Sequence, residues 1–133
     1  MPGLTQAGQQ IFLRHMLGKV AWPMGAPFVA LTTTAPTDAA AGAEATYTGY
    51  ARKSTVGTDW NDPTAATPSV ATNAARITFA ACSALTATVT HFELYDALTG
   101  GNRIAFGALT ASLAVSAGIS PDFAIGQLTI TAD

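Results

Sequence analysis

The most regular pattern of apolar and polar positions lies in residues 86–109. Two runs with β-strand character flank the segment Thr99-Gly100-Gly101-Asn102. Glycine and asparagine adopt positive φ at little steric cost, so this arrangement predicts a β-hairpin. In the first run, a period of two places Phe92 and Leu94 on one face of the strand. We take this hairpin as the centre of a β domain.

The two faces of the predicted hairpin differ in character. Its inward side is formed by one set of apolar residues, which are Phe92, Leu94, Ile104 and Phe106. The opposite face of the first strand carries Val89, His91, Glu93 and Tyr95. Because successive side chains of a strand point to opposite faces, we expect Phe92 and Leu94 to be buried and Glu93 to be more exposed.

Five further short runs have strand character, and turn or loop residues separate them. They are Phe28–Thr33, Tyr50–Val56, Thr72–Ala80, Leu113–Ser116 and Asp122–Thr131. In the third, Ile77 and Phe79 are predicted to point inward, and Arg76 and Thr78 outward. Together with the hairpin they give about seven short strands without βαβ alternation, which favours a mainly β fold, an antiparallel β-sandwich. Residues 1–133 are predicted to form a single domain.

One helix is predicted, over residues 3–18. Leu4, Ala7, Ile11 and His15 recur at spacings of three and four, as on one face of a helix. The Thr5 hydroxyl can cap the first turn, and Gly18 suits the position after the last turn. This N-terminal helix either packs on the sandwich or reaches a neighbouring subunit.

Charge is scarce in the chain, and this narrows the classes of partner. Hydrophobic residues make up 49% of the 133 residues and charged residues 11%, with a formal net charge of −2. This composition fits either a surface that meets other subunits or an alanine bias of the genome. The six Lys and Arg are scattered, so nucleic-acid binding and attachment to an anionic membrane are not expected. We also expect no signal peptide and no membrane-spanning segment.

Candidate catalytic residues are few. His91 and Glu93 share one strand face, as an acid–base pair or two metal ligands could, but a zinc site needs more ligands. A histidine hydrogen-bonded within the scaffold is the simpler interpretation. Cys82, the single cysteine, fits a buried inert thiol. The remaining acids in the long loops are interpreted as solvated charges: Asp38, Glu44, Asp59 and Asp62. We therefore expect no enzyme activity, no metal and no cofactor.

Two tryptophans lie outside the regular pattern. Trp22 precedes the first long strand, and Trp60 stands between Asp59 and Asn61. Each fits an interface anchor or a lid over the core, and Trp60 also fits a sugar contact. The interface is predicted to include the helix, and its candidate residues are Leu4, Ile11, Trp22 and Trp60.

Several segments together resemble a known family. They are Leu4-Thr5-Gln6-Ala7-Gly8, Gly49-Tyr50-Ala51-Arg52-Lys53, the run from Thr72 to Phe79, Val89-Thr90-His91-Phe92-Glu93-Leu94-Tyr95-Asp96-Ala97, Thr99-Gly100-Gly101-Asn102 and Phe106-Gly107-Ala108-Leu109. In this order they resemble small virion structural proteins of tailed bacteriophages, variously labelled head-decoration (cement), tail-fibre or minor structural proteins. The resemblance implies a β-rich, non-enzymatic subunit that binds neighbours in a particle.

Three functions follow as expectations from the resemblance and from Trp60. The first is a capsid decoration protein that binds the major capsid protein and stabilises the head. The second is a tail-tip, tail-fibre or baseplate component, which would bind other virion subunits. The third is a carbohydrate-binding module for host recognition. In each case we expect a homo-oligomer, a trimer or a dimer, made in the host cytoplasm and carried on the virion.

Overall fold

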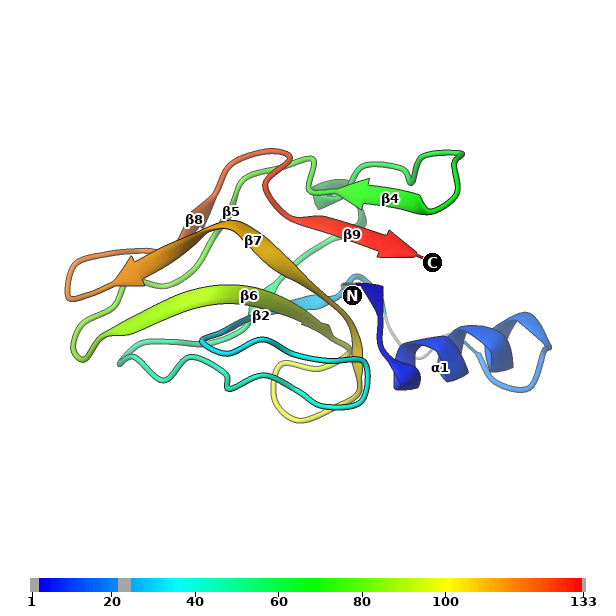
Figure 1. Ribbon diagram of the computed structural model, residues 1–133, viewed down its shortest axis with the longest axis horizontal. Helices are drawn as coiled ribbons and strands as arrows, with labels where there is room; N and C mark the ends of the chain where they lie inside the picture. The colour runs from blue at the N-terminus through cyan, green and yellow to red at the C-terminus, as the bar shows by residue number, and fades with distance from the viewer. Residues whose placement is uncertain (1–2, 22–24, 133) are drawn as a thin grey trace.

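The fold is known from a computed structural model that describes residues 3–21 and 25–132. It is mainly β with an N-terminal helix, as predicted (Figure 1). The elements are β1 (Gly3–Leu4), α1 (Gln6–Met16), β2 (Phe28–Thr32), β3 (Lys53–Ser54), the short helix η1 (Gly57–Asp59), β4 (Ser69–Thr72), β5 (Ile77–Thr78), β6 (Ala87–Tyr95), β7 (Arg103–Val115), β8 (Asp122–Phe123) and β9 (Thr129–Ala132).

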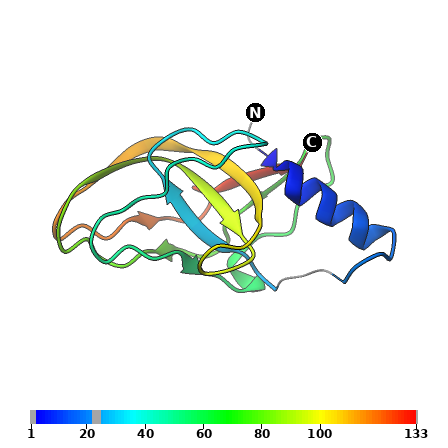
Figure 2. The ribbon, with the colours of Figure 1, turned by 90° about the horizontal axis from the view of Figure 1, so that it is seen from below.

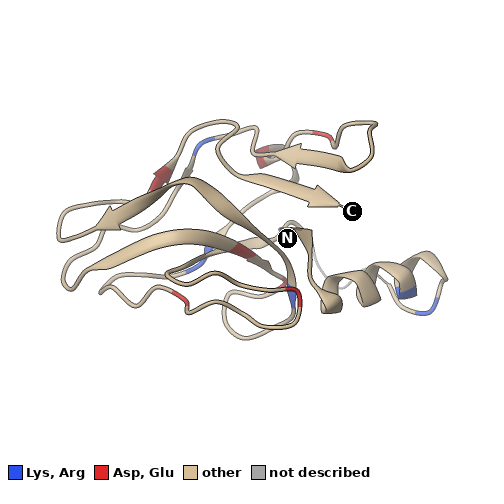
Figure 3. Ribbon diagram, viewed as in Figure 1, with Lys and Arg blue, Asp and Glu red and all other residues tan. Residues whose placement is uncertain are grey.

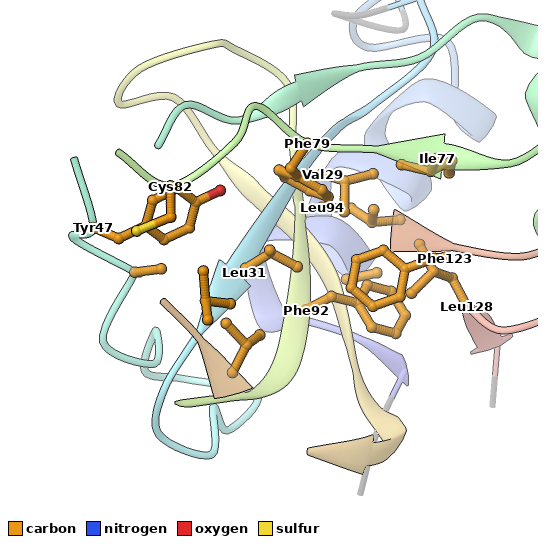
Figure 4. Close-up of a cluster of buried hydrophobic side chains, with 14 residues drawn as sticks. Val29, Leu31, Tyr47, Ile77, Phe79, Cys82, Phe92, Leu94, Phe123 and Leu128 are labelled. Atoms are coloured by element: carbon orange, nitrogen blue, oxygen red, sulfur yellow. The ribbon is translucent and has the colours of Figure 1, made fainter. Parts of the chain in front are cut away.

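The strands form a sandwich-like pair of layers. One layer is an antiparallel sheet in the order β1-β7-β6-β2-β3, and the other holds the antiparallel pairs β4-β9 and β5-β8 (Figure 1). The main core lies between them. In Figure 4 the side chains of Phe92, Leu94 and Leu31 from the large sheet point toward Phe123 and Leu128. Burial of such side chains is the main favourable term in folding.

The central hairpin is confirmed. β6 and β7 pair in antiparallel fashion, and the turn between them places Gly100 at φ +61° and Gly101 at φ +75°, where glycine is favoured. β7 is longer than predicted and continues to Val115, so the separate strand expected at Leu113–Ser116 is the end of β7. The hairpin therefore supplies the two longest strands of the large sheet.

The predicted faces of the hairpin are partly wrong. Phe92 and Leu94 are buried as expected, but Glu93 is also fully buried, at 0% exposure. Loop 33–45 folds back over this second face, so both faces of β6 are covered (Figure 1). Phe106 lies opposite Glu93 in the register rather than on the side of Phe92.

Register shifts explain why Ile104, Phe106 and Val89 lie on other faces than predicted. The pairing of β6 with β7 is irregular between Leu94 and Tyr95, and Ile104 and Phe106 are buried outside the main core cluster. A second irregularity, between Val89 and His91, returns Val89 to the same core as Phe92. A β-bulge shifts the phase of the residues that follow it, and a strict period of two misses that shift.

The other predicted strands are present but shorter. Tyr50–Val56 contains only β3, Thr72–Ala80 contains β5 and the end of β4, and Asp122–Thr131 is divided between β8 and β9. Ile77 and Phe79 are buried, as expected. Their neighbours Arg76 and Thr78 point outward and bond to Asp122, which is also as expected for that face.

The predicted helix is confirmed over most of its length. Leu4 belongs to β1, and α1 begins at Gln6 because the Thr5 hydroxyl caps it, accepting a hydrogen bond from the Gly8 N–H at 3.0 Å. At the other end Gly18 has φ +72°, and its N–H donates to the carbonyl of His15. The N–H of Lys19 donates to the carbonyl of Arg14, which completes a Schellman motif.

The first turn of α1 is the part that touches the body. Gly8 is the buried residue of the helix, and a Cβ atom built on it would lie 2.1 Å from the carbonyl oxygen of Ile104 in β7. The remaining turns extend away from the sandwich (Figure 2). Because Gly8 has no side chain, the first turn of α1 can lie directly against β7, and this contact anchors the helix to the sandwich.

We predict that Gly8→Ala destabilises the protein, although alanine is the better helix former by about 1 kcal/mol. Because the added methyl meets the backbone of β7, the expected loss is about 1–3 kcal/mol in the free energy of unfolding, measured in urea. The matched control is Gln10→Ala on the exposed side of α1, which we expect to be neutral or slightly stabilising. An equal or higher stability of Gly8→Ala would contradict the close packing.

Candidate functional site

The exposed part of α1 is unusually apolar. Phe12 and Leu13 are 49% exposed, Met16 is 59% exposed and Leu17 is 65% exposed. A groove of about 510 Å³ runs beside them, lined by Leu4, Gln9, Phe12, Leu13 and Ala132. Exposed apolar surface of this kind marks interaction sites in soluble proteins. The helix and groove, which we call the α1 surface, form the candidate site.

The helix was predicted from the sequence, and the interface role of its predicted residues Leu4 and Ile11 stays a prediction. Leu4 is half-buried and packs against the core, and Ile11 is also half-buried. The residues that the prediction missed are the exposed ones, Phe12, Leu13, Met16 and Leu17. The sequence held a signal for these exposed residues, because apolar residues lie on more than one side of this helix. Such a helix cannot bury all of them against one core, so a second surface is needed to cover the rest.

Of the two candidate tryptophans, the structure describes only Trp60. Trp22 lies outside the described residues. Trp60 is half-buried and packs against the core, and its indole N–H donates to the Thr55 hydroxyl at 3.1 Å. Its ring thus closes one edge of the sandwich, and its role in an interface remains a prediction.

The base of α1 is held by hydrogen bonds to β7 and to loop 33–45. The Thr5 N–H donates to the Ile104 carbonyl at 2.8 Å, and the Thr5 hydroxyl donates to the carbonyl of Arg103. The N–H of Gln6 donates to the carbonyl of Asp38 at 3.1 Å. The orientation of the α1 surface therefore depends on the position of β7 and of this loop.

A buried ion pair fixes that loop. The Arg103 Nε lies 3.1 Å from a carboxylate oxygen of Glu93, and the two side chains are 9% and 1% exposed. The Nη2 group of Arg103 donates to the carbonyl of Thr37 at 2.6 Å, and the carbonyl of Asp38 lies 3.3 Å away. Burial raises the pKa of Glu93, while the Arg103 guanidinium opposes that rise.

A second ion pair ties the same loop to the hairpin turn. Glu44 accepts hydrogen bonds from Arg52 at 2.9 and 3.1 Å and from the Tyr50 hydroxyl at 2.7 Å. Burial by itself raises the pKa of Glu44, but the bonds from Arg52 and Tyr50 outweigh it and hold that pKa below its usual value. Glu44 is therefore not a solvated loop charge, which corrects the sequence-based interpretation.

Arg52 completes this connection with its remaining donors. Its Nη1 group donates to the carbonyls of Ala97 at 3.0 Å and of Gly100 at 2.8 Å, both beyond the end of β6. Its guanidinium carbon lies 3.6 Å from the centre of the Tyr95 ring, a cation–π contact. The loop, the turn and the base of α1 are thus joined through two arginines.

The candidate catalytic residues are not brought together. His91 contacts the Thr90 hydroxyl at 2.8 Å, whereas Glu93 faces Arg103. Cys82 is buried, and its Sγ lies 3.1 Å from the carbonyl oxygen of Ala84. Within residues 3–21 and 25–132, no group of three or more His, Cys, Asp or Glu is placed to hold a metal ion.

A family of known proteins matches the chain. The model of a family described as podophage GP4 fiber I protein gp80 matches residues 3–131, almost the whole chain. No curated protein matches the chain. No helix of the described part is long and apolar enough to cross a membrane. With a match of this length, the chain belongs to the podophage GP4 fiber I protein gp80 family, a tail-fibre-related family of phage virion structural proteins.

Proposed function

We propose that this protein is a non-enzymatic structural subunit of the phage tail-fibre region and attaches to its neighbours through the α1 surface. The observation that carries the proposal is the projecting helix with its exposed Phe12, Leu13, Met16 and Leu17. A helix of this kind fits a groove or a flat apolar surface on another subunit. The tail-fibre assignment draws its support from the matching family.

The rigid base of α1 supports a structural role. Interfaces built on fixed elements lose less conformational entropy on binding than flexible ones do. Here the cap at Thr5, the contact at Gly8 and the bonds made by Arg103 hold the helix at one angle to the sandwich. A subunit that holds its neighbours in fixed relative positions within a particle benefits from such a rigid attachment of α1.

A capsid decoration protein is the second candidate. The observation that favours it is the shape of the described chain, which is a sandwich with one α-helix and the short helix η1 and lacks an extended shaft segment. Such a unit could bind the major capsid lattice with α1 as its clip. Many weak contacts on a lattice would then give high total affinity.

Immunogold labelling of intact virions distinguishes the two candidates. We expect label at the tail for the fibre role, and hundreds of copies over the head would instead support decoration. Particles without label would overturn both proposals.

Attachment through α1 is tested by complementing a phage that lacks the gene. We expect the Leu13→Glu protein to fold but to be lost from purified virions, because a charge on the α1 surface opposes its burial. The matched control is Ala117→Glu, in the exposed turn after β7. Equal incorporation of the two variants would exclude attachment through α1.

A further inference from the structure

Charge is distributed unequally between α1 and the rest of the chain. Residues 1–20 contain Arg14 and Lys19 and no Asp or Glu. The whole chain has six Lys and Arg and eight Asp and Glu, so the remainder carries four of the former against all eight of the latter, a formal charge of −4. Figure 3 shows that the charges at the α1 end are all of the basic colour.

Half of the charged residues of the body are paired with one another within it. Glu44 pairs with Arg52, Glu93 with Arg103 and Asp122 with Arg76, which are the described ion pairs. Asp96 bonds to Asn102 in the hairpin turn. These groups have their partners, so they are poor candidates for contact with another subunit.

Segment 56–62 carries acidic side chains beside exposed apolar surface. Asp62 is exposed, and its carboxylate, like that of the exposed Asp38 in loop 33–45, makes none of the described hydrogen bonds or ion pairs. Asp59 uses one carboxylate oxygen to accept the N–H of Val56 at 2.8 Å. Val56 is itself 60% exposed, and Trp60 closes the core beside it. This segment therefore combines negative charge with exposed apolar surface.

The α1 surface has the complementary composition. Phe12, Leu13, Met16 and Leu17 provide apolar area, and Arg14 and Lys19 provide positive charge beside it. In its own chain α1 packs on β1 and β7 and extends away from the body, so its exposed side is available to another molecule (Figure 2).

We infer that α1 of one copy docks on segment 56–62 of a second copy. Arg14 and Lys19 would face Asp59 and Asp62, and the apolar side chains of α1 would cover Val56. The two surfaces are different parts of the chain, so the contact is heterologous, and repeating it produces a ring or an open filament of subunits. The inference rests on the proposed function, because it names the partner of the α1 surface.

A charge-reversal cycle on the full chain tests this contact. Sedimentation velocity over a range of concentrations gives the dissociation constant of self-association. We expect Arg14→Glu and Asp62→Arg each to raise that constant about fivefold or more, and the double variant to restore it toward the original value. The matched control is Lys53→Glu, which makes the same change of charge on the edge strand β3 and should leave the constant unchanged.

The outcomes separate this inference from the proposed function. A chain that stays monomeric, or a double variant no better than the single ones, overturns the α1 contact with a second copy. If Leu13→Glu is still lost from virions in that case, α1 binds a different virion protein and the proposed function stands. If the chain self-associates as expected but is absent from virions, the proposed function fails.

Discussion

Phe92→Ala is expected to lower the free energy of unfolding by about 3–5 kcal/mol. The Phe92 side chain is 0% exposed and lies in the core between the two layers (Figure 4). Its ring covers Gly107 of β7, where an added Cβ would lie 2.7 Å from the Phe92 Cε1 atom. Because Gly107 has no side chain to move into the space, the cavity left by the substitution should remain largely open.

Denaturation in urea gives the measurement, and Phe12→Ala provides the matched control. Phe12 is 49% exposed on α1, so the same change of side chain there should alter the free energy of unfolding by about 0.5 kcal/mol or less. Phe92→Leu should fall between the two, since it keeps much of the buried volume. If Phe92→Ala and Phe12→Ala had equal effects, the position of the core would be wrong.

The sequence predicted those elements whose signals are local. The hairpin followed from alternation on both sides of Gly100 and Gly101, and the helix from the cap at Thr5 and from Gly18, which ends it through a Schellman motif. These features depend on residues close together in the chain, and their backbone preferences survive in the folded protein. The burial of Ile77 and Phe79 was predictable for the same reason.

What the sequence missed depends on distant contacts. The burial of Glu93 requires loop 33–45 to cover the second face of β6, and no local pattern places that loop there. The exposure of Phe12 and Leu13 requires α1 to extend beyond the body after its first turn, although apolar residues are usually assigned to a core. The candidate site lies where this assumption fails.

Arg103→Ala is expected to be the most damaging change of a charged residue. It leaves the Glu93 carboxylate buried without its cation and removes the donor to the carbonyl of Thr37, so the expected loss at pH 8 is about 3–5 kcal/mol in the free energy of unfolding. The matched control is Arg76→Ala, which breaks an ion pair whose arginine is 61% exposed. Its cost should be about 1 kcal/mol or less.

The cost of Arg103→Ala should depend on pH in a defined direction. The pKa of Glu93 in the folded protein already lies above the ordinary value of 4.5, so the folded state binds this proton more tightly than the unfolded state does. The Glu93 contribution therefore favours folding at low pH and is lost as pH rises from 4.5 through the folded pKa. Without Arg103 that pKa rises further, and the loss extends over a wider range of pH.

Urea denaturation at pH 5 and pH 8 measures this difference. We expect Arg103→Ala to cost less at pH 5, where Glu93 can be neutralised by a proton, than at pH 8. The pKa of Glu44 is lowered, so the change that Glu44 makes to stability, which has the opposite sign, is confined to pH values below its ordinary range. His15 and His91 are present in both the original protein and the Arg103→Ala variant. Arg76→Ala should show the same small cost at both pH values. An equal cost of Arg103→Ala at the two would mean that Glu93 is not the group left unpaired. A smaller cost at pH 5 would mean that the charge on the Glu93 carboxylate determines how much the buried pair, and with it the base of α1, depends on Arg103.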